Sequence, residues 1–242
     1  MTHPSDPPAF DLAFHWDPVC PFAWLTSKWV DELVRQRGFT VDWRFISLRL
    51  LNADVDYAAD FPAEYEEGHS AGLRLLRVAA AVRESEGSAP MRELYVAMSE
   101  PLFECPPPED GAMIPAPADP HRVRELLGAC GLSPDFADAL TDERWDDVVS
   151  ADTEEALAST GRDVGTPIIR HQPPDGPAFF GPVISRVPEP DEPAPLWDSV
   201  LYLAGFPGFA ELKRSLRERP QLPVFAPAPD AEDWHGGSRR TD

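Results

Sequence analysis

The chain has 242 residues, of which 43% are hydrophobic, and this is enough for one large globular domain or for a domain with a second one inserted. Its 21 lysines and arginines face 42 aspartates and glutamates, which gives a formal net charge of −21. Such a surface repels phosphate backbones and anionic lipids, so neither nucleic acid nor a membrane is an expected partner.

Residues 1–8, where the chain begins, are polar and proline-rich, and we expect them to be disordered. They lack a basic segment followed by an apolar core, so no secretory signal is expected. No apolar run in the chain approaches the length that spans a bilayer. Three cysteines are too few, and odd in number, for a disulfide framework, which fits a reducing compartment. We therefore expect a cytoplasmic protein.

The first predicted strand, Phe10 to Trp16, is a nearly continuous apolar run, as expected for a strand covered on both faces. A helical pattern follows it to about Gln36, and Gly38 suits the position just past the helix end. Pro21 suits the first helical position, because its missing N–H would have no partner there. Cys20 is therefore predicted where a strand ends and a helix begins.

Cys20 is the candidate nucleophile. A sulfur at a helix N-terminus faces free N–H groups and the positive end of the helix dipole, which favour the thiolate. A carboxylate at Asp17 would raise the pKa of the thiol instead, and the distance between the two groups decides which effect is larger. Ala23 stands where a Cys-x-x-Cys pair has its second cysteine, so at most a mixed disulfide with an external thiol can form. The alternative is that Cys20 is a small buried core residue.

The other cysteines and the histidines are weaker candidates. Cys105 lies in a proline-rich loop and could supply a partner thiol only if the two Cα atoms lie within about 7 Å. Cys130 is expected in the core, and His15 is expected to be satisfied within the sheet. His69 follows Tyr65 by one helical turn and could face the same cleft. No spacing resembles a zinc site or a phosphate-binding loop, so no metal and no tightly bound cofactor is expected.

The segment Thr40 to Ser47 is β-branched and aromatic and predicts a second strand, parallel to the first and joined to it by a right-handed crossover. Strand signals stop between about residues 62 and 163. Helical patterns fill this region, with a proline-rich loop at 106–120, and they cover Glu64–Glu84, Met91–Phe103, Asp119–Ala129, a segment that starts at Ser133, and Thr141–Ser159.

Strand signals return at Thr166–Arg170 and Ala178–Gly181, and the short turn between them predicts an antiparallel pair. Pro167 opens the third strand, where no donor is needed. A cis bond before it could present the backbone to a ligand, and a plain trans proline is the alternative. Helical patterns at Pro193–Leu203 and Phe209–Arg217 complete an α/β order of β-α-β, helical insertion and β-β-α. Disorder is expected over residues 220–242.

The Cys-Pro pair at a strand–helix junction and the Gly-Thr-Pro before a later strand resemble the DsbA-like branch of the thioredoxin superfamily. Further motifs resemble the mycothiol-dependent nitroreductases of actinobacteria, namely Trp16-Asp17-Pro18, Cys20-Pro21, Trp24, Ser27, Ser47-Leu48, Leu51-Asn52, Tyr65-x-x-Gly68, Asp163 to Pro167, Phe179 to Val183, and Phe209-x-Glu211-Leu212-Lys213-Arg214. This resemblance covers about Phe10 to Pro223. It implies a thioredoxin-like domain at 9–61 and 164–219, with an all-helical insertion at 62–163.

The resemblance also implies roles for single residues. Cys20 would be the attacking thiol, Pro167 would be cis and pack against it, and mycothiol would be the co-substrate. The residues that would bind the substrate or the thiol are Pro21, Phe22, Trp24, Asn52, Tyr65, Thr166 and Pro167.

The chain departs from the family pattern at three places. Ala23 replaces the resolving cysteine, Phe22 stands in place of a tryptophan, and residues 103–109 replace a stretch that contains histidine and asparagine. A single-thiol route remains, in which Cys20 forms a mixed disulfide with mycothiol, and a second mycothiol or a small redoxin releases it.

Three functional hypotheses follow. The first is a thiol-dependent oxidoreductase with one nucleophilic cysteine. The second is a thiol-cofactor transferase or isomerase, as in the kappa-class glutathione transferases, which bind a thiol without a Cys-x-x-Cys pair. The third is a binding protein that has lost redox chemistry, since a fold alone does not determine function.

Overall fold

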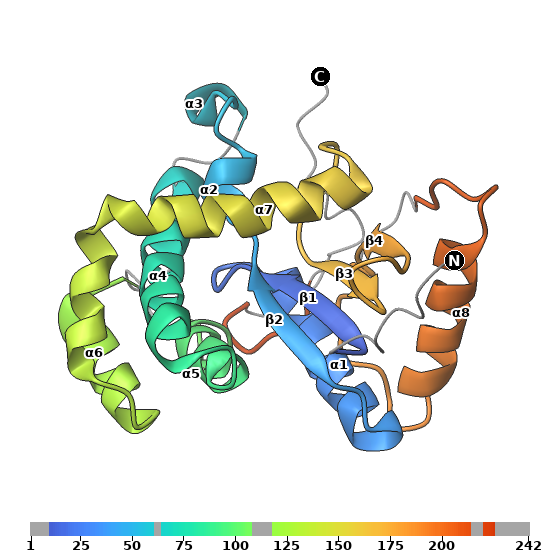
Figure 1. Cartoon of the computed structure of the whole chain (residues 1–242), viewed down its shortest axis with the longest axis horizontal. Coiled ribbons are helices and arrows are strands. Elements are labelled where there is room, and N and C mark those ends of the chain that lie inside the picture. Colours follow the sequence, from blue (N-terminus) through green and yellow to red (C-terminus); the bar gives the residue numbers. More distant parts are fainter. Residues whose placement is uncertain (1–9, 61–63, 108–117, 214–219, 226–242) are drawn as a thin grey trace, which may run out of the picture.

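The computed structural model describes residues 10–60, 64–107, 118–213 and 220–225. Its centre is a four-stranded mixed sheet in the order β2-β1-β3-β4 (Figure 1). The pair β1–β2 is parallel, whereas β1–β3 and β3–β4 are antiparallel, so both predicted pairings are confirmed. The strand bounds are Leu12–Trp16 for β1, Val41–Phe45 for β2, Ile168–His171 for β3 and Ala178–Phe180 for β4.

Every residue of β1 is buried, as the continuous apolar run predicts for a central strand. His15 is only 2% exposed, and its Nδ1 lies 3.3 Å from the carbonyl oxygen of Ile168. Burial lowers the pKa of His15 to about 4, so the ring is neutral near pH 7. His15 lies within the sheet as predicted, but it is only partly satisfied, because its buried Nε2 has no hydrogen-bond partner among the described residues.

Helices cover both faces of the sheet (Figure 1). The helix α1 (Pro21–Arg37) links β1 to β2 and ends at Gly38, whose φ of 71° requires the left-handed conformation that glycine adopts easily. The helix α8 (Pro193–Gly205) packs against α1, and Trp29 Nε1 donates to the Pro193 oxygen over 3.1 Å.

The helix α7 (Asp146–Thr160) lies across the sheet and also across α4, the helix at Glu64–Glu86 (Figure 1). Its buried Asp152 accepts the N–H of Phe45 over 3.0 Å and forms ion pairs with Arg44 and Arg83. The last helix of the expected insertion is therefore part of the sheet's cover, and the division of the chain at residues 62 and 163 stays a prediction.

The remaining helices form a group beside the sheet, and none of the helices in the described residues is long and apolar enough to cross a bilayer. Ser133 caps a 3-10 helix rather than an α-helix, and the expected helix Thr141–Ser159 is divided into a 3-10 turn and α7. The bounds are Glu64–Glu86 for α4, Met91–Phe103 for α5, Pro120–Ala129 for α6, Pro134–Thr141 for η1 and Glu143–Trp145 for η2.

Two short helices follow β2 and were not predicted, α2 (Leu48–Leu51) and α3 (Tyr57–Asp60). The predicted helix Phe209–Arg217 is wrong over residues 209–213, which are not helical, and its residues 214–217 lie outside the described part. Leu212 is 73% exposed, and without burial a short helix is not stable in water.

The segment 220–225 differs from the expected disorder, because the structure packs it into the core. Leu222 and Val224 are 5% and 6% exposed. The N–H of Val224 donates to the Phe103 oxygen over 3.2 Å, and the N–H of Gln221 donates to the Ser185 oxygen over 2.6 Å. The segment therefore ties the end of α5 to the loop before α8. The disorder expected for residues 1–8 and 226–242 lies outside the described residues.

Replacing Leu222 by alanine is expected to lower the free energy of unfolding by about 2–4 kcal/mol, because it leaves a cavity in a packed site. Urea denaturation measures this change. Leu212→Ala is the matched control, since Leu212 is exposed and its loss should cost about 0.5 kcal/mol or less. Equal effects of the two substitutions would contradict the packing of the segment.

Candidate functional site

Cys20 occupies the N-cap of α1, at the junction predicted from the sequence. Its Sγ accepts the N–H of Ala23 over 3.4 Å, and Pro21 takes the first turn of the helix. The backbone N–H of Cys20 donates to the backbone carbonyl oxygen of Asp17 over 3.1 Å, and this bond closes the loop after β1. Cys20 is only 5% exposed, while Pro21 and Phe22 beside it are half-buried.

The Thr166–Pro167 segment meets Cys20 from the other half of the chain. Because β1 pairs with β3 so that His15 lies opposite Ile168, the residues before β3 lie beside the loop after β1. The Cys20 thiol donates to the Thr166 oxygen over 3.6 Å. The peptide bond before Pro167 is cis, as the resemblance implies. The two motifs, 146 residues apart in the chain, are therefore in contact.

The sequence left open whether the pKa of the Cys20 thiol is lowered or raised, and burial is the deciding effect in the structure. Burial raises the pKa of the thiol to about 12, the N–H groups of Ala23 and Phe22 lower it only in part, and the charge of Asp17 raises it further. The thiol form is therefore favoured in the resting protein, because the cost of desolvating a charge exceeds the effect of the helix end. That cost comes from packing that the local sequence does not reveal.

Asp17 is a completely buried carboxylate beside this loop. Its Oδ1 accepts the N–H of Val19 over 3.0 Å, and its Oδ2 accepts the N–H of Leu48 over 2.8 Å. Burial raises the pKa of Asp17 to about 7, although both hydrogen bonds lower it. A Cβ at Gly72 would lie 2.8 Å from Asp17 Oδ1 and 2.8 Å from Val19 Cγ2, so α4 can approach the loop only with glycine there.

Trp24 lies in the core rather than at an open surface. It is 2% exposed, and its Nε1 donates to Glu104 Oε1 over 2.7 Å. Lys28 forms an ion pair with the same carboxylate and stands over the Trp24 ring at 4.9 Å. The rings of Trp24 and Tyr95 meet edge to face at 5.8 Å. The sequence prediction grouped Trp24 with the thiol-binding residues, and the structure places it on the buried face of α1.

Asn52 and Tyr65 lie on the segments that follow β2. The Asn52 Nδ2 donates to the Leu48 oxygen over 2.8 Å, and Asn52 ends α2. The Tyr65 ring meets the His69 ring edge to face at 5.6 Å, and His69 Nδ1 lies 2.9 Å from the Tyr57 hydroxyl. The bond between Leu48 and Asp17, together with the close approach at Gly72, brings these segments to the edge of the sheet where Cys20 lies.

Sequence reasoning missed Tyr57 and Arg49, which the structure adds to this cluster. The guanidinium of Arg49 stands over the Tyr57 ring at 5.3 Å. Burial lowers the pKa of His69 to about 4, and the charge of Arg49 adds to this effect. Only the spacing of His69 from Tyr65 signalled the cluster in the sequence, because the other residues come from helices that were not predicted.

The other two cysteines form no disulfide with Cys20. Cys105 is half-buried, and its Sγ donates to the Leu102 oxygen over 3.8 Å. Cys20, Cys105 and Cys130 are all free. Within the described residues, no group of three or more acidic, histidine or cysteine side chains is arranged to hold a metal ion. The arrangement suits the chemistry of a single thiol.

Two comparisons by sequence extend this description. Residues 19–214 match the protein family described as Mycothiol-dependent nitroreductase Rv2466c, a range that includes Cys20 and Pro167. The chain is also 31% identical over 230 residues to Uncharacterized protein Rv2286c of Mycobacterium tuberculosis, and the match covers 91% of this chain and 90% of that protein.

A comparison by structure identifies the fold. A crystal structure described as a probable DsbA oxidoreductase from Streptomyces coelicolor matches with a TM-score of 0.50 at 16% identity, covering 87% of this chain and 97% of that chain. The fold is therefore the DsbA-like thioredoxin fold with a helical insertion, and the predicted fold class is confirmed.

Alkylation of Cys20 is expected to be slow and to speed up with pH, with a midpoint above the free-cysteine value of about 8.5, because burial raises the pKa of the thiol. The rate with iodoacetamide against pH measures this midpoint, and Cys20→Ser provides the blank for Cys105 and Cys130. A midpoint below about 8.5 would show that the helix end outweighs burial.

Asp17 is expected to make the protein less stable as the pH rises. Its pKa is raised from 3.8 to about 7, so its stabilising contribution is complete below about pH 4 and is lost as the pH rises through 7. In Asp17→Asn this loss is absent. The free energy of unfolding of Asp17→Asn minus that of the wild type should therefore increase by about 2–3 kcal/mol between pH 5 and pH 8.

Urea denaturation at the two pH values measures this gain. Asp54→Asn is the control, because it removes an exposed carboxylate of the same charge. A gain of the same size in both variants would contradict the assignment to Asp17.

Proposed function

The chain belongs to the Rv2466c-like family of mycothiol-dependent nitroreductases, and on that premise we propose that it is a thiol-dependent oxidoreductase that works with one cysteine. Cys20 is the attacking thiol, and mycothiol is the co-substrate. The observation that carries the proposal is the contact of the Cys20 thiol, at the N-terminus of α1, with the backbone of Thr166 before the cis Pro167.

The surroundings of the sulfur support this role. The N–H groups of Ala23 and Phe22 both lower the pKa of the thiol, so they stabilise the negative charge that forms when Cys20 attacks. The Thr166 hydroxyl is buried and has no hydrogen-bond partner in the described structure, which leaves it free to bond to a ligand. Pro21 and Phe22 are half-buried neighbours of Cys20 in the chain, and in this proposal they form the thiol-binding surface together with Asn52 and Tyr65.

The proposed reaction is thiol–disulfide exchange. Cys20 loses its proton, its sulfur bonds to one sulfur of a disulfide, and the other sulfur leaves as a thiolate that takes up a proton. The mixed disulfide on Cys20 then needs a second thiol, because Ala23 cannot attack it. A second mycothiol, or a small redoxin, attacks the mixed disulfide and releases Cys20 as the thiol. Electrons come from these external thiols, and the three free cysteines fit a reducing cytoplasm.

One observation favours a second candidate function. Because burial keeps Cys20 protonated in the resting protein, the cleft could bind a thiol cofactor without using Cys20 as a nucleophile. In that case the protein is a thiol-cofactor transferase or isomerase, or a binding protein without redox chemistry. Binding of mycothiol that survives Cys20→Ser, together with no mixed disulfide in the wild type, would favour this candidate.

Incubation with mycothiol disulfide is expected to add one mycothiol to the wild-type chain, because Cys20 forms the mixed disulfide. Intact-mass spectrometry measures the adduct. Cys20→Ser should carry none, whereas Cys105→Ser and Cys130→Ser are the matched controls and should carry as much as the wild type. Ala23→Cys should replace the adduct with an internal disulfide, because it restores a resolving thiol. An adduct that persists in Cys20→Ser would contradict the proposal.

A further inference from the structure

Arg49 and Cys20 occupy matching positions at one edge of the sheet. Trp16 and Phe45 are partners at the ends of the parallel strands β1 and β2, and Cys20 and Arg49 each follow four residues later. The carboxyl ends of parallel strands meet at the same edge, where ligands bind in open α/β sheets. The hydrogen bond from the Leu48 N–H to Asp17 Oδ2, over 2.8 Å, ties the start of α2 to the Cys20 loop.

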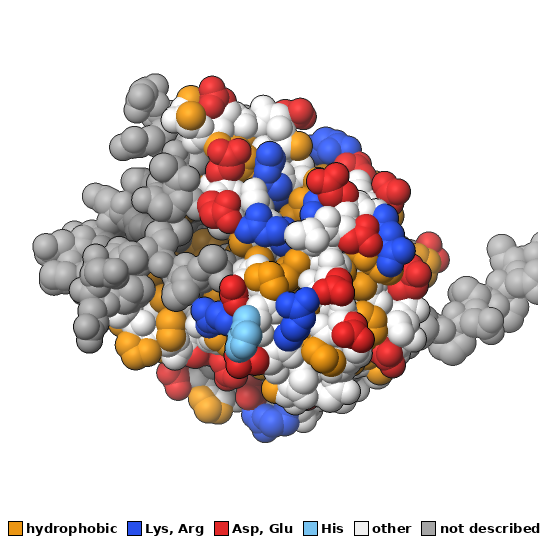
Figure 2. All heavy atoms as spheres, turned by 90° about the vertical axis from the view of Figure 1, so that its left-hand side faces the viewer, with side chains coloured by type: hydrophobic (Ala, Val, Ile, Leu, Met, Phe, Trp, Pro, Cys, Tyr) orange, Lys and Arg blue, Asp and Glu red, His pale blue; other side chains and the backbone are white. Residues whose placement is uncertain are grey.

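Arg49 has no carboxylate partner among the described residues, a property that it shares with Arg122 and Arg170, and of these three it is the one that follows β2 at the edge of the sheet where Cys20 lies. The chain carries 42 acidic against 21 basic residues, so a basic side chain meets a carboxylate easily. Figure 2 shows this mixing on the face formed by the helices beside the sheet. The arginines that do form ion pairs are Arg35, Arg37, Arg44, Arg74, Arg77, Arg83, Arg92, Arg124, Arg144 and Arg162.

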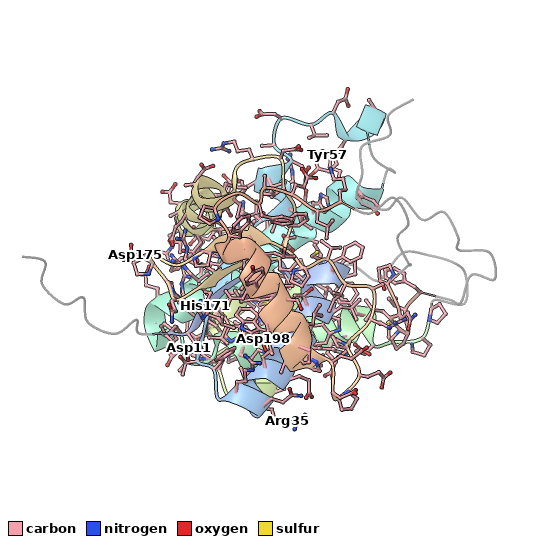
Figure 3. All side chains as sticks on the ribbon, turned by 90° about the vertical axis from the view of Figure 1, so that its right-hand side faces the viewer. Asp11, Arg35, Tyr57, His171, Asp175 and Asp198 are labelled. Carbon is pink, nitrogen blue, oxygen red and sulfur yellow. The ribbon has the colours of Figure 1, made fainter. Side chains whose placement is uncertain are left out.

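The structure holds the guanidinium of Arg49 in place through a ring contact. It stands over Tyr57 at 5.3 Å, and Tyr57 is itself buried and bonded to His69 over 2.9 Å. Arg49 also donates a side-chain hydrogen bond to Tyr57. A guanidinium has five N–H donors, so one such bond leaves others for a ligand. His69 is neutral near pH 7, because its pKa is lowered to about 4, so Arg49 supplies the positive charge of the cluster. In Figure 3, Tyr57 lies on α3 and is well separated from the labelled carboxylates Asp11 and Asp198.

We propose that Arg49 binds a carboxylate group of the substrate that reacts at Cys20, so that the oxidised substrate of this chain is a small carboxylic acid. The proposal rests on the proposed function of Cys20 and deepens it. The planar fork of a guanidinium matches the two oxygens of a carboxylate, and such charged bonds are about twice as strong as neutral ones. In this proposal Arg49 contacts the end of the substrate that lies away from the reacting sulfur.

Two aromatic disulfides test the proposal, a dithiobis(nitrobenzoate), whose rings each carry a carboxylate, and dithiodipyridine, which carries none. In both reactions the Cys20 sulfur bonds to one probe sulfur, the probe's disulfide breaks, its other half leaves as a thiolate, and the Cys20 proton goes to solvent. The readout is the ratio of the two second-order rate constants, carboxylate probe over uncharged probe, each corrected with Cys20→Ser.

Arg49→Gln is expected to lower this ratio about tenfold, the size of one charged hydrogen bond. Arg49→Lys keeps the charge but loses the planar fork, so it should lower the ratio less than Arg49→Gln does. Arg122→Gln is the matched control, because Arg122 is exposed on α6, on the far side of α4 from the sheet, and its loss changes the net charge equally (Figure 1).

If the ratio is unchanged in Arg49→Gln while both probes still label Cys20, the inference about Arg49 is overturned, but the proposed function of Cys20 is not. An equal fall in Arg122→Gln would also overturn it, because the effect would then come from net charge and not from binding. If neither probe labels wild-type Cys20 above the Cys20→Ser blank, the proposed function fails and the inference fails with it.

Discussion

The buried carboxylate of Asp17 joins the segments on which the site depends. One oxygen accepts the N–H of Val19 in the loop that carries the thiol, and the other accepts the N–H of Leu48 at the start of α2. Helix α4 closes over it so tightly that only glycine fits at Gly72. Burying a charged carboxylate is costly unless each of its oxygens accepts a hydrogen bond. The two bonds to Asp17 compensate only part of this cost, so its pKa is still raised to about 7. The relative position of the Cys20 loop and α2 thus depends on a carboxyl group whose pKa is raised to about 7.

Two opposing effects act on the Cys20 sulfur, and their balance explains its resting state. The helix end and two backbone N–H groups favour the thiolate, whereas burial favours the thiol and is the larger effect. A protonated, 5% exposed thiol resists oxidation to the sulfenic acid, since susceptibility follows thiolate character and exposure. This matters more for a single cysteine than for a pair, because Ala23 offers no neighbouring thiol that could rescue an oxidised Cys20 by forming a disulfide.

The sequence predicted those parts of the structure that local signals determine. The apolar run of β1, the cap at Cys20 and the end at Gly38 depend on residues close together in the chain, and the structure confirms them. The short helices α2 and α3 carry no periodic signal, so the cluster around Tyr57 was missed. The burial of segment 220–225 comes from contacts with α5 and with the loop before α8, more than thirty residues away, which no local pattern reveals. The raised pKa of Cys20 has the same origin.

The charge of the chain limits how Arg49 can act on a substrate. A net charge of −21 repels an anionic molecule at long range, and counterions reduce this repulsion beyond about 8 Å at physiological ionic strength. Attraction to one guanidinium is therefore a contact effect, and selectivity for a carboxylate has to arise from bonds at hydrogen-bonding distance. The ring of Tyr57 fixes the guanidinium before any ligand arrives, which reduces the entropy lost on binding. In the proposed reaction, Cys20 therefore supplies the reacting sulfur, and Arg49 supplies the positive charge that distinguishes a carboxylate substrate from a neutral one.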